Sequence, residues 1–292
     1  MRIAVLGVGA VGGWFGGSLV RAGHDVVFLA RGETLRVLRA EGLHLNDDAP
    51  LPVAVVEKLA DVGDIDVVLL AVKVTADTDL PALLADLPER AYVAVTQNSV
   101  EVPARVAEVI GRERTLPGVV RGYFHHTGPG RVEFHGGPVS YDVGTWTGER
   151  DGVVDTLVET LNSAGIDATA HPDIFTDVWE KAMYVTTTGA LGALAKAPLG
   201  QLRTRLRPSL EALMREVYET GAAAGVPLAA DAVDRTMAFA DRMPAEATSS
   251  MHRDILAGRE NELDAQVGAI CRLAERHGTD ARLHELLYRV LG

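Results

Sequence analysis

The stretch Arg2–Leu6 (RIAVL), followed by residues 7–12 (GVGAVG), decides the fold of the N-terminal part of the chain. The first piece is a short apolar run with β-branched residues, which is typical of a buried parallel strand. The second matches the pattern G-x-G-x-x-G. Apolar residues then recur at helical spacing, and another apolar run, Asp25–Ala30, follows. A strand, a glycine turn, a helix and a second strand within about thirty residues predict a Rossmann dinucleotide-binding unit.

Each glycine of this turn has its own chemical purpose in such a unit. Gly7 allows the sharp turn, Gly9 lets a pyrophosphate approach the backbone, and Gly12 lets the helix pack closely on the strand. The phosphates bind the unpaired N–H groups at the positive end of the helix. The candidate cofactor-binding residues are therefore Gly7, Gly9, Ala10, Val11 and Gly12. The alternative is a glycine-rich turn that binds nothing.

The residue after the second strand predicts which dinucleotide binds. An NAD site usually has Asp or Glu there, which accepts hydrogen bonds from the ribose hydroxyls, whereas this chain has Arg31. A guanidinium suits a 2′-phosphate, because it can donate two parallel charge-assisted hydrogen bonds. We therefore predict NADP (NADPH) as the cofactor. Glu33 leaves NAD open, since a shift of its side chain could bring it to the ribose.

Composition limits the remaining classes of function. The 292 residues give room for two domains of ordinary size. The net charge of −12 argues against a nucleic-acid surface, which needs clustered Lys and Arg. The single cysteine, Cys271, excludes an internal disulfide and a Cys-rich zinc site. The chain opens directly on a core strand, and no apolar run reaches the roughly 18 residues needed to span a bilayer. We expect a soluble cytoplasmic protein without membrane or nucleic-acid partners.

Two further apolar runs, Asp66–Val72 and Tyr92–Thr96, predict buried strands that alternate with helices. This alternation indicates a parallel sheet with right-handed crossovers, in which ligands bind at the carboxyl ends of the strands. Lys73 and Asn98 follow these two strands and are candidates for the cofactor or substrate edge of the sheet. Loop solvation and turn formation are the alternatives. Between the glycine-turn unit and these strands, Leu43–Val56 is expected to form an irregular hairpin.

The chain changes character after Leu116. Short β-type pieces at 118–123, 131–134 and 139–143 are expected to be antiparallel strands that extend the sheet. The pair His125–His126 lies between them, but neighbouring residues of a strand point to opposite faces, so the two cannot share one metal ion. We therefore expect no metal site. An amphipathic helix at 152–165 and a strand at 166–170 complete this part.

Beyond residues 171–173 the pattern is helical almost to the end of the chain. The fold class predicted is α/β, with an N-terminal doubly wound Rossmann domain (1–170) and an all-α C-terminal domain (171–292). Gly and Pro separate the expected helices. These helices fall at about 174–195, 207–225, 229–242, 250–258 and 260–277, with a short one at the C-terminus. An exposed face on such an Ala- and Leu-rich domain is compatible with a homodimer.

These residues together resemble the ketopantoate reductase family, the NADP-dependent 2-dehydropantoate 2-reductases of pantothenate synthesis. The resemblance covers nearly the whole chain. Its most specific block is Ser249–Asp264. The other shared features are the glycine turn with Arg31, Lys73 in AVKV, the pair Gln97–Asn98 and Trp179–Lys181 (WEK).

The resemblance implies hydride transfer from NADPH to the 2-keto carbon of a small 2-oxo acid. The family's catalytic lysine falls on Lys181, which would bind the ketone oxygen and supply its proton. The essential glutamate falls on Glu262, which would bind the substrate hydroxyl and help to place Lys181. Ser250 matches the serine that binds the substrate carboxylate. Lys73 and Asn98 match positions that line the cofactor and substrate side of the cleft.

The sequence also departs from the family pattern around the substrate. Positions four and eight beyond the lysine share its helix face and are usually asparagines, whereas here they are Val185 and Gly189. A third asparagine is Ala247 here, and the usual Gln-Asn-Gly ends in Ser99. Each lost amide hydrogen bond would cost a substrate such as ketopantoate about 0.5–1.5 kcal/mol. These changes predict a less polar pocket that is roomier at Gly189.

Three functions follow for testing. The first is an NADPH-dependent reductase of the family whose altered pocket accepts a bulkier or more apolar carbonyl compound. The second is reduction of ketopantoate itself, which Lys181, Ser250 and Glu262 favour. The third is an NADP-binding sensor without catalysis. Retention of Lys181 and Glu262 argues against the sensor, because an inactive site has no chemical need for either residue.

Overall fold

The computed structural model describes residues 1–292, which fold into two compact units. We call the first the sheet unit; it comprises residues 1–73, 79–97 and 102–174. We call the second the helical unit; it comprises residues 74–78, 98–101 and 175–292. The two short loops 74–78 and 98–101 follow strands of the sheet unit along the chain, but they belong to the helical unit. No helix combines the length and the apolar character needed to cross a bilayer.

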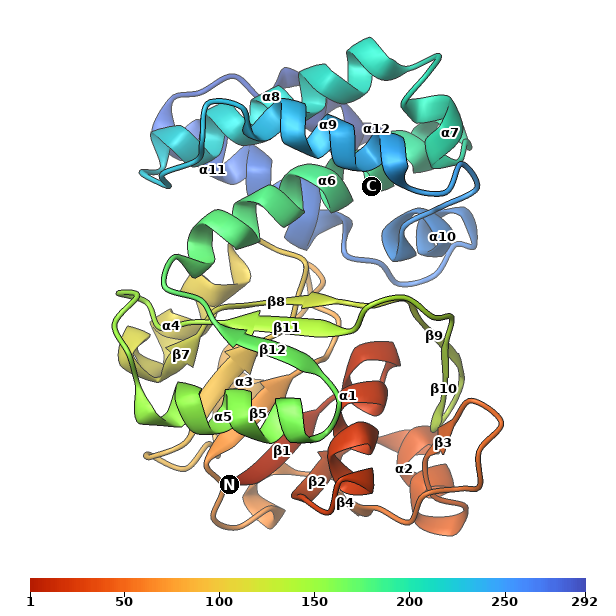
Figure 1. Ribbon diagram of the computed structural model, residues 1–292, viewed down its shortest axis with the longest axis vertical. Coiled ribbons are helices and arrows are strands. Elements are labelled where there is room, and N and C mark those ends of the chain that lie inside the picture. The colour runs from red at the N-terminus through yellow and green to blue at the C-terminus, as the bar shows by residue number, and fades with distance from the viewer. The chain divides into compact units, whose positions relative to one another are not determined.

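The centre of the sheet unit is a six-stranded sheet in which every paired strand is parallel (Figure 1). Its strand order is β4-β2-β1-β5-β6-β7. The strands are β1 (Arg2–Leu6), β2 (Asp25–Leu29), β4 (Ala54–Val56), β5 (Val67–Leu70), β6 (Tyr92–Val95) and β7 (Thr115–Leu116). The middle strands are buried on both faces, as their continuous apolar sequences require. The predicted parallel, doubly wound sheet is confirmed.

Helix α1 (Ala10–Arg21) lies against β1 and β2 and also contacts a smaller sheet, so both of its sides are covered. Its glycines 12, 13, 16 and 17 are all buried. The other helical segments of this unit are α2 (Gly32–Ala40), η1 (Leu59–Asp61), α3 (Leu80–Leu84), α4 (Val102–Ile110), η2 (Arg112–Arg114) and α5 (Gly152–Ser163).

The segments after Leu116 include antiparallel strand pairs, as predicted, but they do not extend the main sheet, so that part of the prediction is wrong. They form two three-stranded sheets, β3-β10-β9 and β12-β11-β8. The strands are β3 (His44–Leu45), β8 (Gly118–Arg121), β9 (Phe124–Gly128), β10 (Arg131–Phe134), β11 (Ser140–Val143) and β12 (Asp167–Ala170). Strand β10 pairs with β3, nearly ninety residues earlier, and the main sheet instead ends at β7.

The expected hairpin at Leu43–Val56 is also wrong in its pairing. Strand β3 pairs with β10, whereas β4 pairs in parallel with β2, so the two pieces belong to different sheets. Only one antiparallel bridge, between Leu43 and Leu51, joins the two arms of the segment. The sequence signal was one of local alternation, and the actual partners are distant in the chain.

The helical unit is all-α, as predicted (Figure 1). Its helices are α6 (Ile174–Ala195), α7 (Leu199–Leu202), α8 (Arg207–Ala223), α9 (Ala232–Arg242), α10 (Ser250–Leu256), α11 (Ala269–His277) and α12 (Arg282–Leu291). The helix expected at 260–277 begins only at Asp264, with a π-helical segment, η3 (Asp264–Gly268), that continues into α11. Short α7 was not predicted.

Candidate active site

The glycine turn is built as a dinucleotide site requires. Gly7 has a φ of +103°, and a Cβ on it would lie 2.7 Å from the backbone nitrogen of Val72. A Cβ on Gly12 would lie 2.0 Å from the carbonyl oxygen of Gly7. Any larger residue at either position would therefore push the helix away from the sheet. A Cβ on Gly9, by contrast, would meet nothing within 4 Å, so the backbone there is open.

The first turn of α1 keeps its positive end available for an anion. Gly9 is the N-cap, no side chain caps the helix, and the first turn has no acidic residue. The N–H groups at Ala10 and Val11 precede the first intrahelical bond, which Gly13 donates to Gly9. Such N–H groups, together with the helix dipole, favour a phosphate. The residues present thus fit the diphosphate of a nicotinamide dinucleotide, which would supply the hydride.

Two charged residues after β2, the basic Arg31 and the acidic Glu33, are candidates for recognition of the cofactor ribose, and they differ in their surroundings. Arg31 is exposed and stands at the N-cap of α2. The Glu33 carboxylate accepts hydrogen bonds from Arg36 one turn later, including one of 2.9 Å from Nε. These hydrogen bonds and the charge of Arg36 lower the pKa of Glu33. Glu33 is therefore engaged within its own helix, and Arg31 is the charged side chain that directly follows the strand.

Gln97 joins the carboxyl ends of two neighbouring strands. Its amide nitrogen donates to the carbonyl oxygens of Leu70 (2.7 Å) and Val72 (2.9 Å). These hydrogen bonds hold the carboxyl end of β5 next to the carboxyl end of β6. Lys73 follows the first of these strand ends, and Asn98 follows the second. Lys73 is exposed and Asn98 is half-buried. In the sequence, Gln97 is visible only as part of the Gln97–Asn98 motif, and no local pattern indicates this structural role.

His126, on β9, lies close enough to Lys73 for the charge of that lysine to act on it. Burial, and to a smaller extent the charge of Lys73, lower the pKa of His126. His125, its neighbour on β9, instead packs against His135, with the ring centroids 4.2 Å apart and the rings tilted by 53°. The two adjacent histidines thus have different surroundings, and the structure contains no group of three or more His, Cys, Asp or Glu that could hold a metal ion.

In helix α6, Lys181 directly follows two residues, Trp179 and Glu180, that contact other helices of the unit. Trp179 is 3% exposed and packs against Gly221 of α8, where a Cβ would lie 2.7 Å from the indole ring. Glu180 forms an ion pair with Arg235 of α9. The WEK sequence therefore holds α6 by a buried aromatic ring on one side and an ion pair on another. Lys181 itself is half-buried, and Val185, also half-buried, lies one turn later.

The space beside Gly189 is filled, so the expected roomier pocket at this position is wrong. A Cβ on Gly189 would lie 2.8 Å from Ser249 Oγ and 2.7 Å from Met251 Cε. Ser249 is the N-cap of α10, and its hydroxyl accepts a 3.1 Å hydrogen bond from the His252 backbone. The start of α10 thus occupies the volume that a larger residue on α6 would need. Ser250, the predicted carboxylate-binding serine, is the exposed first residue of α10.

This packing predicts the effect of Gly189→Ala. Alanine exceeds glycine in helix propensity by roughly 1 kcal/mol. Overpacking against Ser249 and Met251 costs about 1–3 kcal/mol. We therefore expect a net loss in the free energy of unfolding, measured by urea denaturation. Gly152→Ala is the control, because nothing lies within 4 Å of a Cβ at that helical position. Stabilisation by Gly189→Ala equal to the control would show that α10 does not pack as described.

Glu262 lies in a short segment without regular secondary structure, between α10 and η3, and hydrogen bonds fix the residues around it. Arg259 bridges the mostly buried Asp254 at 2.9 Å, which closes the turn after α10. The Asn261 side chain accepts a 3.0 Å hydrogen bond from the Leu263 backbone. The amide nitrogen of Gln266 approaches Glu262 Oε2 at 3.5 Å, and the Gln266 backbone donates to the Glu262 carbonyl oxygen at 2.9 Å. The π-helical segment that follows is of a kind often found at functional sites.

The loop that bears Asn98 belongs to the same unit as these residues. Ser99 donates a 2.5 Å hydrogen bond to the carbonyl oxygen of Ala265, in the π-helical segment just after Glu262. The helical unit therefore contains Asn98, Lys181, Val185, Gly189, Ala247, Ser250 and Glu262. The sheet unit contains the glycine turn, Arg31 and Lys73.

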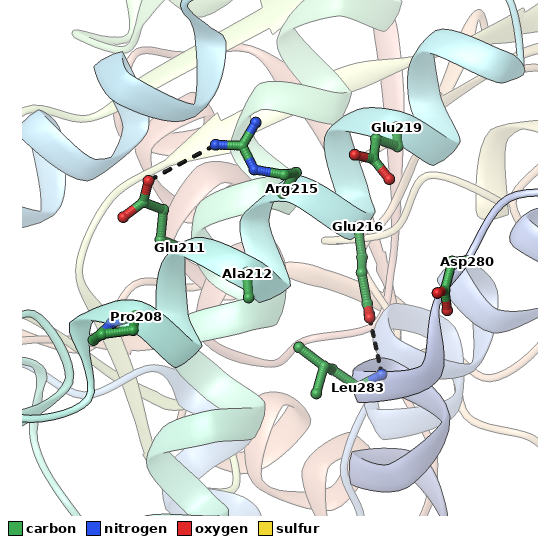
Figure 2. Close-up of a pocket in the computed structure, with 8 residues that line it drawn as sticks. All are labelled: Pro208, Glu211, Ala212, Arg215, Glu216, Glu219, Asp280 and Leu283. Atoms are coloured by element: carbon green, nitrogen blue, oxygen red, sulfur yellow. Dashed lines mark hydrogen bonds and ion pairs between the residues drawn. The ribbon is translucent and has the colours of Figure 1, made fainter.

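A surface pocket elsewhere on the helical unit contains none of the predicted site residues. Figure 2 shows it between α8 and the start of α12; four of its eight lining residues are acidic, and Arg215 is the one basic residue among them. Its Glu216 accepts hydrogen bonds from the backbones of Leu283 (2.9 Å) and His284 (3.1 Å) and so caps α12. An acidic pocket repels the carboxylate of an oxo acid and the phosphates of a dinucleotide.

Comparison with known proteins gives the family. Residues 3–148 match the family model described as ketopantoate reductase PanE/ApbA, and residues 173–292 match its C-terminal model. The 2-dehydropantoate 2-reductase of Caulobacter vibrioides is 31% identical over 94% of this chain and 93% of its own. The structure of 2-dehydropantoate 2-reductase from Geobacter metallireducens GS-15 covers 100% of this chain and 99% of its own, at 27% identity and a TM-score of 0.90.

A third relative shares the fold at lower sequence identity. It is D-mandelate dehydrogenase, solved with NADH and anilino(oxo)acetate; it covers 100% of this chain and 97% of its own, at 20% identity and a TM-score of 0.88. Two family models that between them span nearly the whole sequence, and a curated relative above 30% identity, leave one conclusion. The chain belongs to the ketopantoate reductase family and is an NAD(P)-dependent oxidoreductase that acts on a CH–OH/C=O group.

Proposed function

We propose that this protein is an NADPH-dependent reductase that transfers a hydride to the 2-keto carbon of a small 2-oxo acid, in a pocket altered from that of its relatives. The observation on which the proposal mainly depends is the retention of Lys181, Ser250 and Glu262, together with Asn98, within one compact unit. In this proposal residues 1–170 bind the cofactor, and residues 171–292, together with Asn98, provide the groups that act on the substrate.

Lys181 is the proposed proton donor. As the hydride reaches the 2-keto carbon, the ketone oxygen gains negative charge, and the Lys181 ammonium stabilises it and transfers a proton to it. The product is a 2-hydroxy acid. Glu262 orients Lys181 and binds the hydroxyl of a substrate that has one, such as ketopantoate, and Ser250 binds the carboxylate. Asn98 lines the side of the nicotinamide ribose and substrate, and Lys73 the cofactor edge.

The choice of NADPH depends on Arg31. Glu33, the residue that could have favoured NADH, is paired with Arg36. Arg31 is exposed at the N-cap of α2, where its guanidinium can donate to a 2′-phosphate. D-mandelate dehydrogenase binds NADH on the same fold, so the fold itself is compatible with either cofactor.

The substrate is proposed to be more apolar than ketopantoate. Val185, half-buried one turn beyond Lys181, offers no hydrogen bond to a polar substrate. Gly189 offers none either, although the Ser249 hydroxyl stands beside it. Because α10 fills that space, extra room for a larger substrate is not expected next to Gly189. The altered wall is therefore the one formed by Val185.

The test measures the reduction of a panel of carbonyl compounds, with the decrease in NADPH absorbance as the readout. Ketopantoate is compared with 2-oxo acids that bear branched aliphatic or phenyl groups. Higher kcat/KM for the apolar acids supports the altered pocket. Higher kcat/KM for ketopantoate supports the second candidate, 2-dehydropantoate 2-reductase, which is the activity named for the Caulobacter relative. Tight NADPH binding with no turnover of any compound would favour the sensor.

A further inference from the structure

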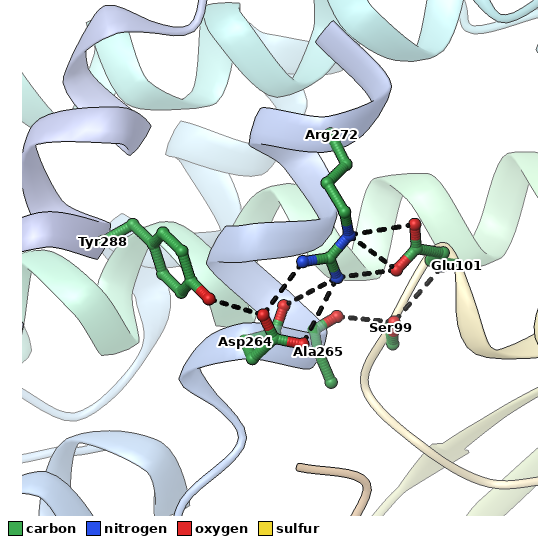
Figure 3. Close-up of polar contacts among 6 residues, drawn as sticks. All are labelled: Ser99, Glu101, Asp264, Ala265, Arg272 and Tyr288. Carbon is green, nitrogen blue, oxygen red and sulfur yellow. Dashed lines mark hydrogen bonds and ion pairs between the residues drawn. The ribbon is translucent and has the colours of Figure 1, made fainter. Parts of the chain in front are cut away.

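Arg272, on α11, connects two segments that the proposed function places at the substrate. Figure 3 shows its guanidinium between the carboxylates of Glu101 and Asp264. Its Nε lies 3.2 Å from both carboxylate oxygens of Glu101, and Nη2 lies 2.7 Å from Glu101 Oε2. On its other side, Nη1 donates to Asp264 Oδ1 at 2.9 Å. The geometry is a two-sided fork, which lysine cannot reproduce.

Additional contacts make this a closed network. The Tyr288 hydroxyl donates to Asp264 Oδ1 at 2.5 Å, and Arg272 Nη2 also reaches the Asp264 carbonyl oxygen at 3.3 Å. The side chains of Glu101 and Asp264 are only 11% and 18% exposed. The hydrogen bonds that Arg272 donates to Glu101, followed by those to Asp264, raise the pKa of Arg272. The guanidinium therefore lies between two largely buried carboxylates that would otherwise repel each other.

The network joins two short segments next to proposed site residues. Glu101 is three residues beyond Asn98, and Asp264 is two residues beyond Glu262. Between them, Ser99 donates to the Ala265 carbonyl oxygen. Arg272 therefore sets the position of the Asn98 loop relative to the Glu262 segment, and it does so at the π-helical segment Asp264–Gly268, which departs from regular helical hydrogen bonding.

We propose that Arg272 is a positioning residue for the reduction: paired with Glu101 and Asp264, it holds Asn98 and Glu262 in the geometry that binds the substrate. The inference depends on the proposed function, because it assigns Asn98 and Glu262 to the substrate. Arg272 itself need not touch the substrate. Misplacement of bound groups by about 1 Å can cost a reaction about a hundredfold, so the effect of losing the fork should be measurable.

The test compares Arg272→Lys and Glu101→Gln with the control Arg207→Ala. Arg207 forms a two-contact bridge to Asp241 at 2.8 and 3.1 Å within the same unit, away from the proposed site residues. For both network variants we expect kcat/KM to fall about tenfold to a hundredfold, mainly through a higher KM for the carbonyl substrate. The dissociation constant of NADPH should stay within about twofold, because the phosphates bind at the glycine turn. Arg207→Ala should leave KM unchanged.

Thermal unfolding separates positioning from simple stability. If the network variants lower Tm and leave KM as Arg207→Ala does, the side chains are structural only and the inference is overturned. Glu101→Gln keeps the size and most contacts of the side chain, so it serves if Arg272→Lys does not fold. Absence of any carbonyl reduction by the unmodified chain would overturn the proposed function and this inference with it. Turnover by the unmodified chain with unchanged KM in both network variants would overturn this inference alone.

Discussion

Replacement of Lys181 by methionine is expected to lower kcat/KM for the accepted carbonyl substrate about a hundredfold to ten-thousandfold, the usual contribution of a positioned proton donor. Methionine is also an unbranched side chain, one heavy atom shorter than lysine and similar in helix propensity, but it has neither the charge nor the proton. The anchors of α6, Trp179 against Gly221 and Glu180 with Arg235, are untouched by the change. The loss should therefore reflect chemistry at the ketone oxygen rather than a displaced helix.

The measurement is steady-state reduction together with NADPH titration. NADPH affinity should remain close to that of the unmodified chain, because the glycine turn and Arg31 are unchanged. Lys58→Met is a matched control, since Lys58 is an exposed lysine of the sheet unit. NADPH oxidation that is unchanged in Lys181→Met for every accepted substrate would show that another group donates the proton.

The parts of the fold that sequence predicted well are those whose cause is local. Strand β1, the glycine turn and α1 follow one another directly, and the positive φ of Gly7 and the close approach of Gly12 to the Gly7 carbonyl oxygen are requirements of the turn itself. Helix α6 has the predicted bounds because its apolar spacing is continuous over Ile174–Ala195. Local pattern and tertiary packing agree in these segments, so the pattern is sufficient.

The errors arose where a distant partner decides the structure. Strand β3 pairs with β10, and the segments after Leu116 form their own sheets because of such pairings. No periodicity within either stretch names its partner. The sequence also gives no sign of the π-helical segment Asp264–Gly268, because one widened turn does not change an otherwise helical pattern.

The same distinction applies to the candidate site. The replacement of an expected asparagine by Gly189 suggested space, because the sequence shows what a residue lacks and not what lies beside it. The structure places Ser249 and Met251, some sixty residues later, against that glycine. Likewise, nothing in the sequence around Asn98 indicates that Glu101 pairs with Arg272. Charged residues on a helix are ordinarily solvated, so their pairing requires coordinates to recognise.

Replacement of Arg31 by alanine is expected to raise the dissociation constant of NADPH about tenfold to a hundredfold, because hydrogen bonds to a charged group contribute about 1.5–3 kcal/mol. The affinity for NADH should change little, since NADH lacks the 2′-phosphate that the guanidinium would bind. Arg39→Ala is the matched control. It removes the same charge from the exposed last turn of α2, at the opposite end of this helix from Arg31. Both affinities are measured by fluorescence titration of the reduced cofactors.

A second variant, Arg36→Ala, tests whether Glu33 has a role in cofactor choice. Its carboxylate is held by Arg36, so Arg36→Ala should release it toward the ribose if it has any role in cofactor choice. Tighter NADH binding in Arg36→Ala, with NADPH binding retained, would show that the Glu33–Arg36 pair keeps the site selective for the 2′-phosphate. Equal affinity of the unmodified chain for NADPH and NADH would contradict the proposal, because an arginine that recognises a phosphate must discriminate between a cofactor that has it and one that does not.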